Sequence, residues 1–399
     1  MTERNLPPLL DAAGKFPAER RETFRRLFAQ EVFGVSPAYS APVCGTLQDR
    51  ETYPGLGCRE TVELRFQTPQ GAYAFPLYIY WPEQAEGPLP MVLFICNRPR
   101  RDTPMTPPPG LDMARLGQLM AGTGGALPSP PPEGGEPAVT RGCTLDGALD
   151  ADNWPVEMLL QRGVATAAFY TEDLEPDRCT DGKQGLLCHF DAMDTRGPER
   201  WGAIAAWAFG ASRALDYLTS DARTGRDIAV AGHSRGGKTA LWCAANDPRV
   251  TCCYANNSGC TGAALSRGKR GESILQINTL FPYWFCGNYK LYNGHAERLL
   301  VDQHMLLALV APRLLYLASA TEDLWSDPEA EFDGAAAASP AWQALGCEGL
   351  GCAALPAPGS PSHTGRIGYH VRAGGHALTR EDWALFCDFW QAHRTTDKI

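Results

Sequence analysis

The chain has 399 residues, of which 44% are hydrophobic and 10% aromatic, so it can bury a large core and belongs with the globular proteins. Its formal net charge is -9 without long acidic or basic runs, which disfavours binding to nucleic acids or to anionic membranes and leaves the oligomeric state open. No apolar run approaches the roughly 20 residues that span a bilayer. Because the first residues lack the layout of a signal peptide, we expect a cytoplasmic protein for the chain as it stands, or a secreted or periplasmic one if a leader precedes it.

The expected elements of the first part of the chain are a helix, an antiparallel pair and a buried strand. Residues 17–32 carry aromatic residues at helical spacing and predict an amphipathic helix that braces the domain. Residues 59–67 and 72–81 alternate with period two and predict an antiparallel pair, and the continuous apolar run 90–96 predicts a strand buried on both faces. The Pro- and Gly-rich segment 101–149 is interpreted as an insertion or long surface loop.

Strands and helices then alternate to the end of the chain, which is typical of a doubly wound, mostly parallel sheet in a three-layer α/β sandwich. We therefore expect an N-terminal helical or extended brace in residues 1–58 and one α/β domain in residues 59–399. The expected helices are 155–162, 201–218, 237–245, 303–310 and 380–393, and the expected strands are 165–170, 228–231, 250–255, 313–318 and 368–372.

A nucleophile motif lies between the expected strand 228–231 and the helix that follows it. Residues 232–236 read Gly-His-Ser-Arg-Gly, a G-x-S-x-G pattern. Glycine is needed on both flanks because the serine of such an elbow has strained backbone geometry and lies close to its neighbours. Ser234 is therefore predicted to be a nucleophile at a helix N-terminus, with the backbone N–H of Arg235 as an oxyanion donor. This context predicts an α/β-hydrolase fold.

Serine needs a base, and the order serine, acid, histidine of this fold places that base after the last strand. His376 follows the expected strand 368–372 and is the predicted base. The side chain of His233, inside the elbow turn, is expected to point away. The remaining candidates lie in a strand, a helix, a loop and near the chain end: His370, His304, His363 and His393.

The triad acid is expected after the strand 313–318. Asp323 comes first at the expected turn distance, Asp327 is the alternative, and Glu322 is expected to face solvent. Some hydrolases place the acid after the preceding strand, but residues 255–260 contain no carboxylate.

Fourteen cysteines raise the question of disulfides or metal sites. Cys96, Cys243 and Cys387 lie within apolar strand or helix patterns, which favours buried free thiols. No C-x-x-C pairs with a second one or with spaced histidines, so we expect no structural zinc, and ester hydrolysis by a triad needs no metal or organic cofactor.

Five motifs in order resemble the glucuronoyl esterases of carbohydrate esterase family 15. They are the elbow with Ser-Arg-x-Gly-Lys, Asn-Ser-Gly-Cys at 257–260, Pro-Tyr-Trp-Phe at 282–285, the segment 302–313, and Asp323 followed two residues on by Trp325. The likeness runs from about residue 59 to the C-terminus, except for the insertion.

The resemblance implies a triad of Ser234, His376 and an acid, with Arg235 at the oxyanion through its backbone N–H and its guanidinium. It implies four substrate contacts: Lys238 to sugar hydroxyls of a uronate, Trp325 over the sugar or alcohol, and, less directly, Gln276 and Glu272. Many members have a glutamate where Asn257 stands, so this chain is similar to the members whose acid follows the later strand.

The implied activity is hydrolysis of a carboxylate ester of a uronic acid, above all a 4-O-methylglucuronoyl ester on xylan or in a lignin–carbohydrate linkage. A deacetylase of xylan or another acetylated sugar would use the same triad and is the first alternative. A non-catalytic carbohydrate-binding homologue is the second, with Asn257 in place of a carboxylate as its best support.

Overall fold

The computed structural model describes residues 4–38, 41–83, 87–100, 151–180, 184–190 and 197–394, with short pieces at 103–104, 111, 117–118, 139–140, 144–145 and 149. The predicted insertion at 101–149 therefore lies almost wholly outside the described residues. Its described pieces include the antiparallel pair β5 (Thr103–Pro104) and β6 (Val139–Thr140).

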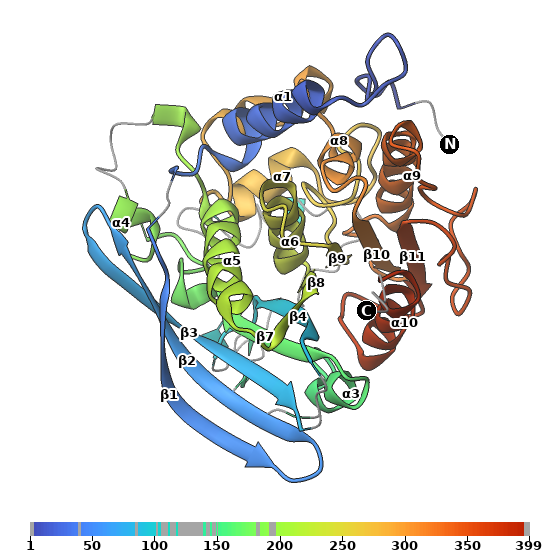
Figure 1. The fold of residues 1–399 in the computed structure, drawn as a ribbon. Helices are drawn as coiled ribbons and strands as arrows, with labels where there is room; N and C mark the ends of the chain where they lie inside the picture. The colour runs from blue at the N-terminus through green and yellow to red at the C-terminus, as the bar shows by residue number, and fades with distance from the viewer. Residues whose placement is uncertain are drawn as a thin grey trace, which may run out of the picture.

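A nine-stranded sheet forms the centre of the described structure, in the order β1-β2-β3-β7-β4-β8-β9-β10-β11 (Figure 1). The strands from β7 to β11 are parallel, whereas β1, β2 and β3 form an antiparallel edge. Their bounds are β1 (Cys44–Tyr53), β2 (Gly57–Thr68), β3 (Gly71–Pro82), β4 (Leu89–Cys96), β7 (Ala165–Tyr170), β8 (Thr224–His233), β9 (Cys252–Asn256), β10 (Leu314–Ala320) and β11 (Ile367–Arg372).

Helices cover both faces of this sheet, as predicted for a three-layer sandwich. On one face lie α1 (Ala18–Phe28), α5 (Ala203–Ser220), α6 (Arg235–Asn246), α8 (Gln303–Ala308) and α9 (Pro328–Ala344). On the other lie α3 (Val156–Gln161) and α10 (Arg380–His393). The shorter elements are α4 (Leu187–Phe190), α7 (Ile274–Leu280), a π-helical turn (Ala29–Phe33) and four 3₁₀ turns (Thr171–Asp173, Gly197–Glu199, Asn288–Tyr292, Ala296–Arg298).

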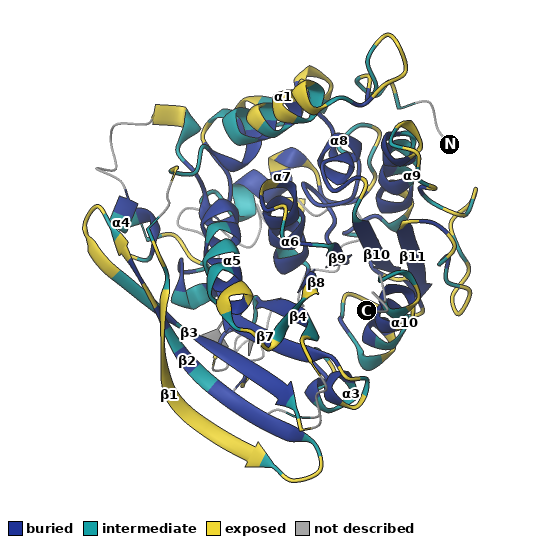
Figure 2. Ribbon diagram, viewed as in Figure 1, coloured by how far each residue is buried: buried dark blue, intermediate teal, exposed yellow. Residues whose placement is uncertain are grey.

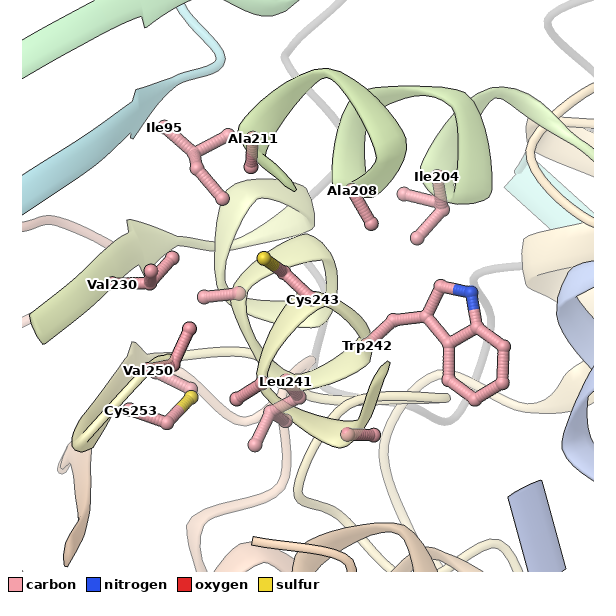
Figure 3. Packing of buried hydrophobic residues seen from close by; sticks show 14 of the residues in the cluster. Ile95, Ile204, Ala208, Ala211, Val230, Leu241, Trp242, Cys243, Val250 and Cys253 are labelled. Atoms are coloured by element: carbon pink, nitrogen blue, oxygen red, sulfur yellow. The ribbon is translucent and has the colours of Figure 1, made fainter. Parts of the chain in front are cut away.

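Successive residues of the buried strands point to opposite faces, so each strand contributes to two cores. In β4, Leu93 belongs to the core under α5 and α6, whereas Phe94 belongs to the core under α3 and α10. The adjacent cysteines of β9 divide in the same way, with Cys253 in the first core and Cys252 in the second. Figure 3 shows Cys243 of α6 among the side chains of the first core. Every cysteine that the structure describes is a free thiol, so the expectation of buried free thiols is confirmed for Cys96, Cys243 and Cys387.

Strand β1 and helices α7 and α9 are among the elements that were not predicted from the sequence. Strand β1 is exposed along nearly all of its length, and Figure 2 shows it as an exposed band beside the buried β2 and β3. Because it buries neither face, it carries no alternation, and it lies within the segment interpreted as a brace. Helix α9 is rich in alanine and contains Pro340, which weakens a helical pattern, and α7 is only seven residues long. No helix among the described residues is long and apolar enough to cross a bilayer.

Candidate active site

The elbow sits at the carboxyl end of β8, where ligand sites of open parallel sheets gather. Ser234 stands between the end of β8 and the start of α6, with φ of 56° and ψ of -124°. A Cβ on Gly232 would lie 2.1 Å from the carbonyl oxygen of Gly236, so the flanking glycine is required by the close approach of strand and helix. The strained turn predicted from the G-x-S-x-G pattern is therefore present.

The amino end of α6 faces the same place as Ser234. The backbone N–H of Ser234 donates to the carbonyl of Asn256 at 2.9 Å, which ties the elbow to the end of β9. Arg235 is the first helical residue, so its N–H has no acceptor within the helix. That N–H and the positive end of the helix dipole are suited to a developing oxyanion beside Ser234.

His376 and Asp323 meet across the loops that follow β11 and β10. Nδ1 of His376 lies 2.6 Å from Oδ2 of Asp323. The Asp323 side chain is 2% exposed, whereas that of His376 is 39% exposed. Burial alone would raise the pKa of Asp323, but the hydrogen bond and the charge interaction with His376 outweigh it and hold this pKa below its usual range. A carboxylate at Nδ1 leaves Nε2 as the basic nitrogen of the ring.

The other two carboxylates of this segment are used differently. Asp327 is the N-cap of α9, with Oδ1 accepting from the N–H of Ala330 at 3.1 Å and Oδ2 from that of Arg270 at 2.7 Å. Glu322 is exposed, as expected. The structure thus brings Asp323, and not Asp327, to the imidazole of His376.

Asn257, at the alternative acid position, also contacts Asp323. Its Nδ2 donates to Oδ2 of Asp323 at 2.6 Å, and its backbone φ is 45°. The same loop is held by the buried Glu331 of α9, whose Oε1 accepts a hydrogen bond from the N–H of Gly259 at 2.8 Å. The amide of Asn257 therefore stabilises the ionised carboxyl of Asp323.

The loop that carries His376 is anchored by Arg372, the last residue of β11, which sequence reasoning missed. Its Nε donates to Oδ2 of Asp382 at 3.0 Å, and Asp382 is fully buried. Its terminal nitrogens donate, at 2.6 to 3.2 Å, to carbonyl oxygens on both sides of His376, those of Ala373, Gly375 and Ala377. Because Arg372 fixes the loop on both sides of His376, the imidazole is held more firmly than it would be in a loop without these hydrogen bonds.

His233 does not point away from the site, so that expectation is wrong. Its ring centroid lies 4.5 Å from that of His376, and its Nδ1 is 2.6 Å from Oδ1 of Asn256. The side chain of His233 extends from the end of β8 over the neighbouring strand β9, which brings its ring to His376 in the loop after β11. The other histidines have partners outside this cluster, such as Asp382 for His370 and the carbonyl of Pro7 for His304.

The guanidinium of Arg235 is held by an acid that sequence reasoning missed. Its Nη1 pairs with Oδ2 of Asp177, and its Cζ lies 4.7 Å from the ring centre of Trp284. Oδ1 of Asp177 accepts from Trp284 Nε1 at 2.8 Å and from the hydroxyl of Tyr283 at 3.1 Å. Burial alone would lower the pKa of Arg235, but Asp177 raises it, so the side chain keeps its charge. The Asp177 residue lies in an irregular loop with no motif that could have identified it.

Three of the four predicted substrate contacts, Lys238, Glu272 and Trp325, lie near one another. Lys238 is 4% exposed and donates from Nζ to the carbonyl of Ser258 at 2.5 Å. Burial lowers the pKa of Lys238, and the nearby buried carboxyl of Glu272 opposes that effect. The backbone N–H of Glu272 donates to the carbonyl of Trp325, a half-buried residue, at 2.8 Å.

Gln276 is used, at least in part, by its own helix. Its Oε1 accepts from the N–H of Ser273 at 2.6 Å, and Ser273 caps α7 in return. Its contact with a substrate stays a prediction. Within the described ranges, no cluster of three or more His, Cys, Asp or Glu side chains is arranged to hold a metal ion.

Comparison with known proteins places this geometry in a family. Residues 148–346 match the family model described as glucuronyl esterase, fungi. Carbohydrate esterase MZ0003, from an unknown prokaryotic organism, is 34% identical over 390 residues, which cover 96% of this chain and 86% of that protein. The solved glucuronoyl esterase from Solibacter usitatus superposes with a TM-score of 0.78 at 34% identity, over 97% of each chain.

A fungal relative is similar over a shorter stretch. The 4-O-methyl-glucuronoyl methylesterase of Schizophyllum commune is 31% identical over 218 residues, which cover 50% of this chain and 54% of that protein. The chain thus spans about half the length of this fungal relative, but nearly all of the bacterial structure. The fold class predicted from the sequence is confirmed, and the chain belongs to carbohydrate esterase family 15, the glucuronoyl esterases, which are serine carboxylic-ester hydrolases.

Proposed function

We propose that the protein hydrolyses the ester between the carboxyl group of a 4-O-methylglucuronate residue and an alcohol. The observation that carries this proposal is the coincidence of a nucleophile elbow at Ser234 with the His376–Asp323 pair and with two cations on the same helix turn, the half-buried Arg235 and the buried Lys238. A polar acyl group such as a uronate is what such cations would hold beside the reacting carbonyl.

In the first step, His376 removes the proton of Ser234 and the alkoxide attacks the ester carbonyl. The N–H of Arg235, together with its guanidinium, stabilises the negative oxygen, and the alcohol leaves with the proton from His376. In the second step, water attacks the acyl-enzyme with His376 again as the base, and the uronic acid is released. Asp323 orients the imidazole and stabilises its charged form. Asn257 supports this acid, which speaks against a homologue that has lost its triad.

The test compares two esters and two serine variants. Benzyl glucuronate carries the sugar on the acyl side, whereas 4-nitrophenyl acetate has only an acetyl group there, and we expect a higher kcat/KM on the glucuronate. Ser234→Ala should lower kcat by about 10⁴-fold or more. Ser220→Ala, at the exposed end of α5, should leave it unchanged.

Two results would redirect the proposal. Brisk acetate hydrolysis with a negligible rate on the glucuronate would make the protein a deacetylase. If Ser234→Ala changed no measurable property and a fluorophosphonate probe labelled neither form, the protein would be a carbohydrate-binding homologue without catalysis.

A further inference from the structure

A second imidazole packs directly against the predicted base. His233, the residue before the nucleophile, is 4% exposed, and its ring is tilted by 44° against that of His376 at a centroid distance of 4.5 Å. The proposed mechanism assigns no role to the side chain of His233. A chain needs neither a histidine nor any other ring at this position to form the elbow, which requires only glycine on its flanks.

The ring of His233 is itself firmly held. Its Nδ1 lies 2.6 Å from Oδ1 of Asn256, which accepts only, so Nδ1 carries the proton. Asn256 is fully buried, and its Nδ2 in turn points to the hydroxyl of Tyr254 at 3.5 Å. Both residues belong to β9, so the ring is fixed to the centre of the sheet.

His233 is also neutral. Burial lowers its pKa well below the ordinary value, and the neighbouring His376 adds to that effect. The other charged groups near it are Arg98 and Asp323. A neutral ring can lie against His376 when that base takes up a proton, whereas a second imidazolium would repel it.

His376 needs such a support on one side. Its hydrogen bond to Asp323 fixes the Nδ1 edge of the ring, but 39% of the side chain is exposed, and Ala373 and Gly375 in the same loop are exposed too. A ring held at one edge is still free to tilt about that bond, and a tilt displaces Nε2, the nitrogen that takes the proton of Ser234 in the proposed mechanism. A rigid surface against the ring face removes that freedom.

We propose that His233 is a positioning residue, whose ring is the wall against which His376 is held in line with Ser234. The proposal rests on the serine–histidine chemistry of the proposed function but not on its substrate. It requires that kcat depends on the ring of His233 rather than on its hydrogen bond to Asn256.

Two variants separate these features. His233→Phe keeps a ring and loses the hydrogen bond, whereas His233→Asn keeps a hydrogen-bonding group and loses the ring. We expect His233→Asn to lower kcat on benzyl glucuronate by about 10- to 100-fold, because a displacement of about 1 Å costs on the order of 10²-fold. KM should stay within about threefold in both variants, and His233→Phe should keep kcat within about threefold of the wild type, because neither change alters a group that touches the substrate.

The rate of labelling by a fluorophosphonate should follow the same order, and this readout does not depend on the natural substrate. If the wild type is labelled but does not cleave the glucuronate, the proposed substrate fails and the labelling rates still decide the role of His233. If the wild type is not labelled, both proposals fail. Asn256→Ala removes the hydrogen bond and keeps the ring, so it should lower the labelling rate less than His233→Asn does. It replaces His233→Phe in this comparison if that variant does not fold.

His304 supplies the matched control. It is 2% exposed and bonds to the carbonyl of Pro7, outside the triad cluster, so His304→Asn should lower the melting temperature without lowering kcat of the folded protein. A wild-type kcat in His233→Asn, an equal loss in the Phe and Asn variants, or a change confined to KM would each overturn the proposal.

Discussion

The two sides of the site use their polar groups in opposite ways. On the triad side, defined by Ser234, His376 and Asp323, one hydrogen-bond chain leads from a buried acid to an imidazole that is 39% exposed. On the cation side, defined by Arg235 and Lys238, each charge already has a partner inside the protein, Asp177 and the carbonyl of Ser258.

We interpret this difference as a division between groups that transfer protons and groups that bind the substrate. A base must present an unused lone pair, and Nε2 of His376 is left for that purpose by the acid at Nδ1. A buried cation without a partner would be costly, so the cations are held in place by protein oxygens before any ligand arrives. We therefore propose that the cation side is preorganised to bind a polar acyl group, and the triad side to transfer protons.

The strongest way to break the triad side is Asp323→Asn. The amide cannot hold the imidazolium that forms during acyl transfer and favours the wrong tautomer of His376, so kcat should fall by about 10³- to 10⁴-fold. Steady-state rates on benzyl glucuronate measure this. Glu322→Gln, at the exposed position directly before Asp323, should keep the wild-type rate, and a similar loss there would show that the loop, not the acid, matters.

The cation side is tested by Asp177→Asn. The variant keeps an oxygen for Trp284 but loses the charge that holds the guanidinium of Arg235. Removing one oxyanion donor costs about 10²- to 10³-fold, and a donor that is only displaced should cost less, about 10- to 100-fold in kcat with little change in KM. Asp173→Asn, in the same segment but paired with Arg100, is the control. Equal effects of the two variants would mean that Arg235 does not depend on Asp177.

Lys238→Met tests substrate selection on the same side. The substitution keeps the length of the side chain and removes the buried charge, so we expect kcat/KM on benzyl glucuronate to fall by about tenfold and that on 4-nitrophenyl acetate to stay nearly constant. Lys290→Met, at an exposed position, should change neither. A parallel loss on both esters would place Lys238 in the support of the Ser258 loop rather than in substrate binding.

The sequence predicts the parts of this molecule that follow local rules. Buried strands such as β4 and β8, the glycine-flanked Ser234 and the late position of His376 each carry a pattern that reflects their own backbone. Asp177, Arg372 and the packing of His233 on His376 carry none, because their roles arise from contacts between segments far apart in the chain. Strand β1 was missed for a different reason, since an edge strand that buries neither face has no hydrophobic period.

Asp323 and Asp327 illustrate the same limit within one loop, and Asp327→Ala sharpens the distinction. Asp327 accepts from the N–H groups of Ala330, Arg270 and Gly271, and its φ is 64°. Loss of these bonds should lower the free energy of unfolding by about 1 to 3 kcal/mol, while kcat of the folded protein stays unchanged. Urea denaturation of Asp327→Ala and of Asp327→Asn, which retains a capping oxygen, checks this. A collapse of kcat in folded Asp327→Asn would return Asp327 to the list of candidate acids.

The dependence of stability on pH gives the smallest effect. The folded pKa of Asp323 lies below its ordinary value, because the hydrogen bonds that it accepts outweigh the opposing effect of burial. Its contribution is therefore fully present above the unfolded pKa of about 3.9 and is lost as the pH falls toward the folded pKa. Between about pH 4 and pH 2.5, the free energy of unfolding of the wild type should fall more steeply than that of Asp323→Asn, by at most about 1.4 kcal/mol per pH unit. Parallel curves at low pH would mean that Asp323 binds a proton as readily in the folded protein as in the unfolded chain, which is incompatible with the buried acid on which the triad side depends.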